Sequence, residues 1–220
     1  MREQYLMQLK KLHEAMLEMG ELCQQAIGLA IRALGECNDA LIAQEQETDS
    51  EIDKLEREIE SLCLQLLLKQ QPVASDLRFI SAAMKVVTDV ERIGDHAADI
   101  AEIVPHLAGV RKAGDPAVSK SIEMGRKAHK MLNDAMAAFA AEDEAAAKAV
   151  IEADDAVDYD FNSIKRMLAA EIAADPGKID AALDVLMVIK YLERIGDHAV
   201  NVAEWVEFLH TGRYHHENMF

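Results

Sequence analysis

Apolar side chains recur along most of the chain three or four residues apart, which is the spacing of one face of an α-helix. A representative stripe lies between residues 38 and 71 and consists of Leu41, Ile52, Leu55, Ile59, Leu62 and Leu66. No stretch alternates apolar and polar residues with a period of two, so we predict helices and no β-sheet.

Glycine, proline and capping residues divide this pattern into six predicted helices. The first three span about residues 4–34, 38–71 and 73–105, and the last three span about 116–141, 143–174 and 176–210. Asn38 is suited to cap the second helix, and Asp115-Pro116 is a typical start for the fourth. The last residues, 211–220, have no strong pattern and are predicted to be loose.

An internal repeat relates the first three predicted helices to the last three. Residues 18–53 align without a gap on residues 123–158, and the heptapeptide Glu-Arg-Ile-Gly-Asp-His-Ala occurs at 91–97 and again at 193–199. Such a long period indicates two structural units and not a solenoid of short repeats. We therefore predict an all-α fold of two tandem three-helix bundles with a pseudo-twofold internal repeat. The predicted divisions are residues 1–107, residues 115–210 and a C-terminal tail at 211–220.

The amino-acid composition favours helices over sheets, and the net charge limits the kinds of molecule that the protein can bind. Only 5% of the 220 residues are aromatic, whereas the hydrophobic share of 50% is enough to bury a sizeable core. The formal net charge of −17 repels phosphate backbones, so we predict no nucleic-acid binding and expect metal cations or basic proteins as partners. No run approaches the roughly 20 apolar residues of a membrane span, so any membrane association would be peripheral.

The cysteines and the N-terminus indicate a reducing cytoplasm. Cys23, Cys37 and Cys63 are odd in number and lack CxxC spacing, so we predict small buried hydrophobic residues and neither disulfides nor a thiolate zinc site. The first residues are charged and lack the apolar core of a signal peptide.

Carboxylates at helical spacing recur in both copies of the heptapeptide. Glu91 and Asp95 lie four residues apart, and Glu193 and Asp197 repeat the pair. The preceding helix of each unit carries two aspartates with the same spacing: Asp49 and Asp53, then Asp154 and Asp158. Because unpaired carboxylates four residues apart repel each other on a helix, the duplicated pairs indicate that a cation offsets the repulsion.

Three glutamates extend the aspartate stripe in the first unit only. They are Glu45, Glu56 and Glu60, and the second unit has Val150, Phe161 and Lys165 at these positions. Since only the aspartates are specified twice, we predict that the three glutamates are solvated surface charges.

Both acidic stripes border the core-facing stripe of their helix, so neighbouring helices would bring the acids together. We predict one carboxylate-rich metal site in each unit. The predicted ligands are Asp49, Asp53, Glu91, Asp95 and Asp99 in the first unit, and Asp154, Asp158, Glu193 and Asp197 in the second, where Asn201 replaces Asp99. Oxygen ligands suit hard ions such as Mg²⁺, Mn²⁺, Ca²⁺ and Fe³⁺. The alternative is that the acids are solvated helix faces, with Arg92 and Arg194 forming salt bridges across helices.

The motifs of common enzyme classes do not occur in the sequence. There is no HExxH, no Walker lysine loop and no GxSxG elbow. Paired Glu-x-x-His motifs of ferritin-like di-iron proteins are represented only by Glu207 and His210. His96 and His198 lie off the acidic stripe, which favours a packing or hydrogen-bonding role. We predict no catalytic residues and a protein that is not an enzyme.

The duplicated heptapeptide, each copy preceded by a helix with Asp-x-x-x-Asp, resembles the PhoU family. The Asp76-Leu77-Arg78-Phe79-Ile80 segment that opens the third helix is also similar to that family. The resemblance implies an all-α protein of two related three-helix bundles. It further implies metal binding through these motifs, in some members as multinuclear iron clusters, with Mn, Mg, Zn and Ca as alternative ions.

The resemblance also implies a cytoplasmic regulator of phosphate transport and phosphate-starvation signalling. Such a protein acts as a negative regulator of the phosphate-specific ABC transporter and its two-component system. The implied partners are the ATPase subunit of the transporter, the phosphate-sensing histidine kinase and a second copy of the chain in a homodimer. Two other readings stay open: a carboxylate-bridged metalloenzyme or metal-storage protein, and a metal-free helical adaptor.

Overall fold

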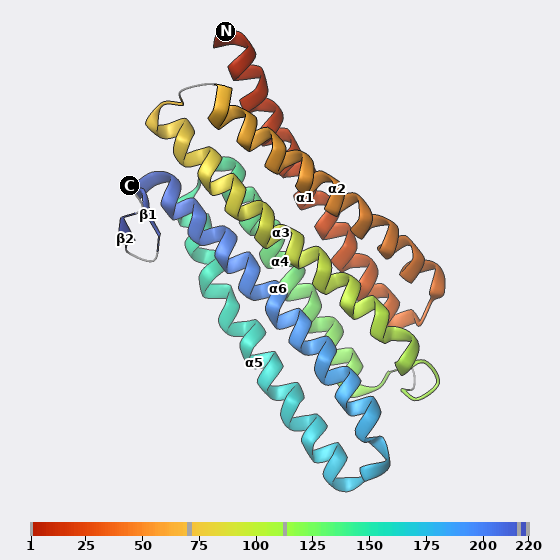
Figure 1. Ribbon diagram of the computed structural model, residues 1–220. Coiled ribbons are helices and arrows are strands. Elements are labelled where there is room, and N and C mark those ends of the chain that lie inside the picture. The colour runs from red at the N-terminus through yellow and green to blue at the C-terminus, as the bar shows by residue number, and fades with distance from the viewer. Residues whose placement is uncertain (1, 70–71, 112–113, 215–216, 219–220) are drawn as a thin grey trace.

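The computed structural model describes residues 2–69, 72–111, 114–214 and 217–218, and in these ranges the chain forms six long helices (Figure 1). They are α1 (Arg2–Glu36), α2 (Asp39–Lys69), α3 (Ala74–Leu107), α4 (Pro116–Ala141), α5 (Glu144–Ala174) and α6 (Ile179–Thr211), with a short 3₁₀ turn, η1 (Pro176–Lys178), before α6. The predicted all-α class is confirmed. The predicted helix ends differ from the observed ones by only a few residues.

Side-chain caps begin two of the helices where the sequence predicts them. The Asn38 carboxamide oxygen accepts a hydrogen bond from the Ala40 N–H at 3.0 Å, at the start of α2. The Asp115 carboxylate accepts hydrogen bonds from the Ala117 and Val118 N–H groups, at the start of α4. These contacts satisfy donors that the first turn of a helix cannot satisfy itself.

The end of the chain differs from the prediction. Two short antiparallel strands, β1 (Arg213–Tyr214) and β2 (Glu217–Asn218), follow α6, so the prediction of no strand and a loose tail is wrong for these residues. The Tyr214 ring stacks on Trp205 of α6 with 4.1 Å between ring centroids. An aromatic contact therefore holds the strand pair, and such a contact leaves no periodic signal in the sequence. Residues 215, 216, 219 and 220 of the predicted tail lie outside the described residues.

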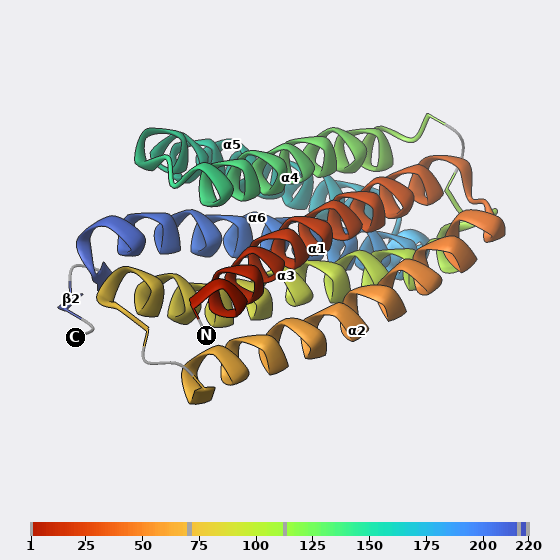
Figure 2. The ribbon, with the colours of Figure 1, turned by 90° about the horizontal axis from the view of Figure 1, so that it is seen from above.

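The helices pack as two groups of three that share one long interface. Helices α1 to α3 contact one another, as do α4 to α6, and the two groups meet where α3 packs on α6 and α1 packs on α4. Helices α2 and α5 lie on opposite sides of the molecule (Figure 2). Within the described ranges, each of them contacts long helices of its own group only. Each unit therefore has an outer helix, α2 or α5, on an inner helix, α3 or α6.

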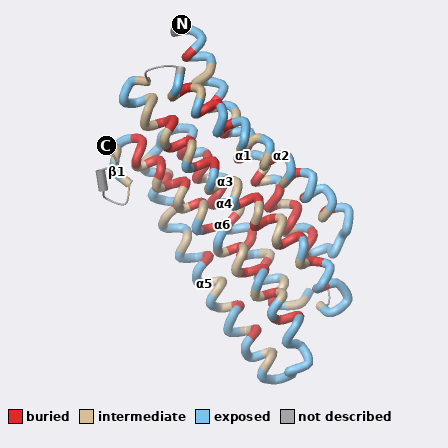
Figure 3. Tube along the Cα trace, in the orientation of Figure 1, coloured by how far each residue is buried: buried red, intermediate tan, exposed pale blue. Residues whose placement is uncertain are grey.

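The buried residues lie along the facing sides of the helices, most densely on the inner helices (Figure 3). Ile52 of α2 and Val87, Val90 and Ala97 of α3 are fully buried, as the apolar stripes predict. Each large aliphatic side chain buried in this way contributes about 1.5–3 kcal/mol. Among the described helices, none has both the length and the apolar character needed to cross a bilayer.

The three cysteines do not share one environment. Cys23 and Cys63 are buried, as predicted, whereas Cys37 is exposed. The prediction for Cys37 is wrong because this residue lies in the turn between α1 and α2, where its φ is +48°. Cys23 donates a hydrogen bond from its Sγ to the Val90 carbonyl oxygen at 3.2 Å, which ties α1 to α3.

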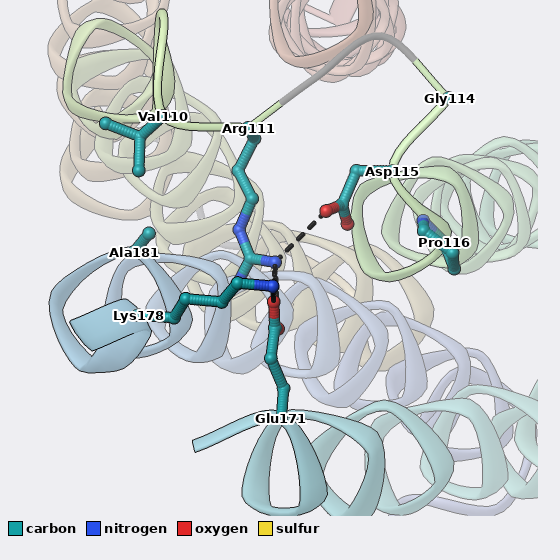
Figure 4. Close-up of a pocket in the computed structure, with 8 residues that line it drawn as sticks. All are labelled: Val110, Arg111, Gly114, Asp115, Pro116, Glu171, Lys178 and Ala181. Atoms are coloured by element: carbon teal, nitrogen blue, oxygen red, sulfur yellow. Dashed lines mark hydrogen bonds and ion pairs between the residues drawn. The ribbon is translucent and has the colours of Figure 1, made fainter. Parts of the chain in front are cut away.

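A group of ion pairs holds the segment between the two units (Figure 4). The Arg111 Nη1 lies 3.1 Å from Asp115 Oδ2 and 2.8 Å from Glu171 Oε2, and its side chain is only 7% exposed. Lys178 also reaches Glu171, with its Nζ 3.2 Å from Oε1. These side chains line a hollow of about 430 Å³. The group fastens the segment after α3 to α5 and η1, and thereby fixes how the second unit follows the first.

Replacing Arg111 tests the contribution of this group. We expect Arg111→Ala to lower the free energy of unfolding by about 3 kcal/mol, because it leaves the half-buried Asp115 carboxylate without this partner and Glu171 with Lys178 alone. The control is Arg32→Ala, whose partner Glu36 is 3.7 Å away and whose side chain is 59% exposed. That change should cost no more than about 0.5 kcal/mol. Equal losses in urea unfolding would contradict the assignment.

Candidate metal centre

The acids of the first unit meet along the contact between α2 and α3. These helices run in opposite directions (Figure 1). Asp53 on α2 therefore lies across from Glu91 and Asp95 on α3. The opposite end of the stripe brings Glu45 on α2 close to the charges of Asp99 and Glu102. The carboxylates thus form a row between two neighbouring helices, beside the apolar contact that joins them.

Three carboxylates in this row are placed to share one ion. One oxygen from each of Asp53, Glu91 and Asp95 lies within 4.8 Å of the other two, and all three residues are half-buried. Carboxylate oxygens bind Ca²⁺ at about 2.3–2.6 Å and Mg²⁺ at about 2.0–2.1 Å, so small rotations of these side chains would bring all three oxygens onto one ion. The structure therefore brings together three of the five residues predicted as ligands in the first unit. We call Asp53, Glu91 and Asp95 the acidic trio.

Gly94 allows the two helices to approach closely beside the trio. A Cβ at this position would lie 3.0 Å from Ile52 Cδ1 and 3.8 Å from Asp49 Oδ1. Asp49, another predicted ligand, is thereby held against α3 without belonging to the trio. Burial, and then the charges of Asp53 and Asp95, raise the pKa of Asp49.

Arg92 supplies a counter-charge at the outer edge of the trio. Its Nη1 donates a hydrogen bond to Asp95 Oδ2 at 2.8 Å, and its Nε lies 3.5 Å from Glu91 Oε2. These contacts are made within α3, and not across helices as the alternative reading expected. The Arg92 side chain is 55% exposed, and exposed ion pairs stabilise weakly. Arg57 Nη1 also lies 3.7 Å from Asp53 Oδ2, with 66% of its side chain exposed, so two exposed arginines face three carboxylates and leave an excess of negative charge.

Burial and the excess negative charge both act on the pKa of Glu91. Burial, and then the neighbouring Asp95, raise its pKa to about 7, although Arg92 acts in the opposite direction. A carboxyl with a raised pKa is one whose charged form lacks sufficient compensation. A bound cation would supply that compensation.

The second unit repeats the arrangement between α5 and α6 in a looser form. A Cβ at Gly196 would lie 3.1 Å from Asp154 Oδ1, as Gly94 admits Asp49 in the first unit. This Oδ1 is buried and has no hydrogen-bond partner. Burial, and then Asp158, Asp197 and Glu193, raise the pKa of Asp154 to about 6.

The predicted ligands of the second unit are neighbours without converging on one point. In the described part of the chain, the acidic trio alone brings three such groups within 4.8 Å. Lys190 forms an ion pair with Glu193, and Asp158 and Asp197 are exposed. Asp154 Oδ1, which has no hydrogen-bond partner, could bind a cation. Glu193 and Asp197 would have to rotate toward that cation to become ligands.

Glu45 contradicts the prediction that it is a surface charge. Its side chain is fully buried, and its counterpart Val150 is 2% exposed, so this position belongs to the core in both units. Burial, and then Asp49, raise the pKa of Glu45 to about 8. Glu60 is exposed, as predicted, and Glu56 is half-buried. The valine itself was the available signal, because an apolar residue at a repeated position indicates burial there.

The heptapeptide histidines take part in hydrogen bonds and ring contacts. His198 Nδ1 lies 2.9 Å from Asp89 Oδ1, and Asn201 donates from Nδ2 to the same oxygen at 2.9 Å. Asn201, at the position of Asp99, thus joins α6 to α3. The His96 ring stacks on Tyr191 with 5.4 Å between centroids. These contacts agree with the packing and hydrogen-bonding role predicted for the histidines.

The fold and the paired acidic helices define a class of two-repeat helical proteins with carboxylate clusters. The family model described as the PhoU domain matches the chain at residues 16–104 and 122–206. The chain belongs to the PhoU family.

Curated relatives and solved structures resemble the chain over most of its length. It is 34% identical to the phosphate-specific transport system accessory protein PhoU homolog of Pseudomonas aeruginosa, over 96% of this chain and 86% of the relative. The homolog of Zymomonas mobilis is 38% identical over 89% and 82%. The crystal structure of PhoU from Pseudomonas aeruginosa superposes with a TM-score of 0.90 at 33% identity, covering 95% of this chain and 100% of that one.

A second solved structure has the same fold. It is the phosphate transport system regulatory protein PhoU from Streptococcus pneumoniae, with a TM-score of 0.86 and 27% identity, covering 95% of this chain and 98% of that one. The chain therefore shares the architecture of two related three-helix units with both solved structures over 95% of its length.

The raised pKa of Glu91 predicts how stability without metal depends on pH. Below the unfolded pKa of about 4.3, Glu91 is protonated in both states and its stabilising contribution is complete. As the pH rises to about 7, the unfolded state releases the proton first, and this contribution is lost. We expect wild type to lose more unfolding free energy than Glu91→Gln between pH 5 and pH 8 in chelator.

Glu60→Gln is the control for this comparison, because Glu60 lies on α2 and is exposed. It should follow the pH dependence of wild type. Identical slopes for wild type and Glu91→Gln in urea unfolding would contradict the environment described for Glu91.

Proposed function

We propose that this protein is a cytoplasmic regulator of phosphate transport and of phosphate-starvation signalling. The observation that carries the proposal is membership of the PhoU family across both repeats. Relatives at about a third identity are named accessory proteins of the phosphate-specific transport system. A solved neighbour of the same fold is titled a regulatory protein of phosphate transport.

The regulation we propose is negative and proceeds by protein contact. The chain would bind the ATPase subunit of the phosphate ABC transporter and the phosphate-sensing histidine kinase, and restrain both when phosphate is abundant. A net charge of −17 favours association with basic surfaces on such partners. The relatives are named accessory proteins, which supports regulation by protein–protein contact and not by enzymatic turnover of a substrate. We also propose that the protein acts as a homodimer.

We further propose that the acidic helix pairs bind metal. In the first unit the acidic trio would hold the ion, with Asp49 beside it. In the second unit Asp154, Asp158, Glu193 and Asp197 would close on one. The unpartnered Asp154 oxygen and the proximity of the trio support this assignment. The donors are all oxygens, which suits Fe³⁺, Mn²⁺, Mg²⁺ or Ca²⁺ better than Zn²⁺.

Bound metal would change the surface that a partner meets. The ion neutralises repulsion between α2 and α3, or between α5 and α6, and holds the outer helix on the inner one. It also reduces the negative charge of each unit. Metal occupancy would in this way set how firmly the regulator docks, without taking part in a reaction.

Metal content tests the assignment. We expect the protein with Asp95→Asn and Asp197→Asn together, purified after growth with added iron and manganese, to retain less metal than wild type in elemental analysis. Both changes remove a charged ligand and keep the side-chain shape. The control is Glu60→Gln with Asp155→Asn, which changes the net charge equally at exposed positions on the outer helices. Equal metal content in the two variants would overturn the sites.

Deletion of the gene tests the regulatory role. Cells that lack the protein should express a phosphate-starvation reporter in high phosphate, because the restraint on the kinase is lost. Wild-type protein supplied in trans should restore repression. The deletion strain would show normal repression if the protein has no negative regulatory role.

A further inference from the structure

Basic side chains gather in a hollow between α1 and α2, although the chain as a whole is strongly acidic. These two helices pack side by side and run in opposite directions (Figure 1). The hollow has a volume of about 550 Å³, which is in the range of small-molecule sites. Its charged lining consists of three cations, Lys11 of α1 and Lys54 and Arg57 of α2, and one acid, Glu58 of α2. The lining is therefore positive in a chain with a net charge of −17.

The acids nearest to these cations leave the hydrogen-bond donors of the hollow available. Lys54 Nζ lies 3.9 Å from Glu58 Oε1, and Arg57 Nη1 lies 3.7 Å from Asp53 Oδ2. Both distances are too long for a hydrogen bond, and ion pairs between exposed side chains stabilise weakly. Lys11 is exposed and forms no ion pair with the described residues. An anion in the hollow could therefore take hydrogen bonds from all three cations.

The second unit shows that the fold does not need the two cations of α2. Tyr159 aligns with Lys54, and Asn162 with Arg57, when the gap-free alignment of the repeats is carried along the outer helices. Tyr159 is 68% exposed, and the Asn162 side chain donates a hydrogen bond to the Asp158 carbonyl oxygen of its own helix. The outer helix α5 thus packs on its neighbours without a cation at either position.

The lining of the hollow, and not the net charge of the chain, decides which ion the hollow attracts. The Debye length is about 8 Å at physiological ionic strength, so exposed carboxylates farther away than this are largely screened. Along the same groove, Glu18 and Glu51 line an adjoining hollow and limit the basic section on that side. Gln8 and Ser61 line the basic hollow ten residues away from them along their helices, and both add neutral hydrogen-bond donors.

We propose that this hollow binds an oligophosphate, an anion with two or more linked phosphate groups. Arginine can form paired hydrogen bonds to a phosphate group, and lysine binds phosphate as a point charge. A monovalent anion would neutralise only one of the three cations, whereas linked phosphates can contact Lys11, Lys54 and Arg57 together. Inorganic polyphosphate and nucleoside triphosphates share this chemistry.

The size of the basic hollow also limits what can bind there. A long nucleic acid would extend beyond the lining onto acidic surface, where its phosphates are repelled. A short oligophosphate, or the end of a longer one, stays within the lining. The inference does not rest on the metal binding or on the regulation proposed above.

The test is isothermal titration calorimetry of the metal-free full chain with sodium tripolyphosphate at low ionic strength. Metal is removed and the chelator dialysed away beforehand, because a bound ion would itself attract phosphate. We expect saturable binding of one tripolyphosphate per chain, weakened by added sodium chloride. Orthophosphate should bind more weakly, because one phosphate group cannot reach all three cations.

Two matched variants locate the site. Lys11→Gln with Lys54→Gln removes one cation from each helix and should weaken tripolyphosphate binding about tenfold or more, because two charge-assisted contacts are lost. Lys120→Gln with Lys165→Gln is the control, since it makes the same change of charge at exposed positions on α4 and α5. The control should bind as wild type does. All four positions are exposed, and circular dichroism checks that both variants keep the helical fold.

A parallel titration with ATP identifies the source of the phosphates. Equal affinity for ATP and tripolyphosphate supports a site that reads the phosphates alone, and tighter binding of ATP supports a site that also contacts the nucleoside. Much weaker binding of ATP supports inorganic polyphosphate as the ligand.

Three results would overturn the site and identify the cations as solvated surface charges. They are the absence of saturable tripolyphosphate binding to wild type, wild-type affinity in the Lys11 and Lys54 variant, and equal weakening in the control variant. None of these results bears on the metal content of the acidic helix pairs or on the starvation reporter, so the proposed function stands or fails separately.

Discussion

The close packing of an outer helix on an inner helix at Gly94 and Gly196 is the constraint on which the acidic sites depend. Ile52 packs over the first glycine and Val157 over the second. Asp49 lies three residues before Ile52, and Asp154 lies three residues before Val157. This packing therefore places both aspartates close to acids of the inner helix. Burial of each large aliphatic side chain contributes about 1.5–3 kcal/mol. Repulsion between two half-buried carboxylates about 4 Å apart costs about 4 kcal/mol, so the burial of two or more such aliphatic side chains is needed to offset it.

The two units share this packing and differ in the side chains that neutralise or add to the negative charge of the acids. In the first unit Arg92 pairs with acids of its own turn, and the buried Glu45 adds a further carboxyl. In the second unit Lys190 pairs with Glu193, and Val150 replaces the buried acid. The internal repeat therefore preserves the backbone arrangement more strictly than the electrostatics. Metal would bind the two halves unequally if the proposed sites are occupied.

The contact between the inner helices makes one body of the two units. Asp89 of α3 accepts a hydrogen bond from Asn201 of α6 and lies beside the His198 ring. His198 belongs to the heptapeptide of the second unit, so this motif also forms part of the interface with the first unit. Arg111 fastens the connecting segment at the end of the molecule. The outer helices α2 and α5 are thus carried on a shared core. A change at either acidic site would act on a helix that lies at the surface of the molecule.

The sequence by itself determined the helices, their number, the internal repeat and the acidic stripes, because each of these is a periodic property of a single segment. Tertiary structure alone decided which three of the five acids predicted for the first unit converge, that Arg92 bonds within α3, and that Glu45 is buried. Periodicity places a side chain on a face of its own helix. The distance to a neighbouring helix depends on the residues of both, down to a missing Cβ at Gly94.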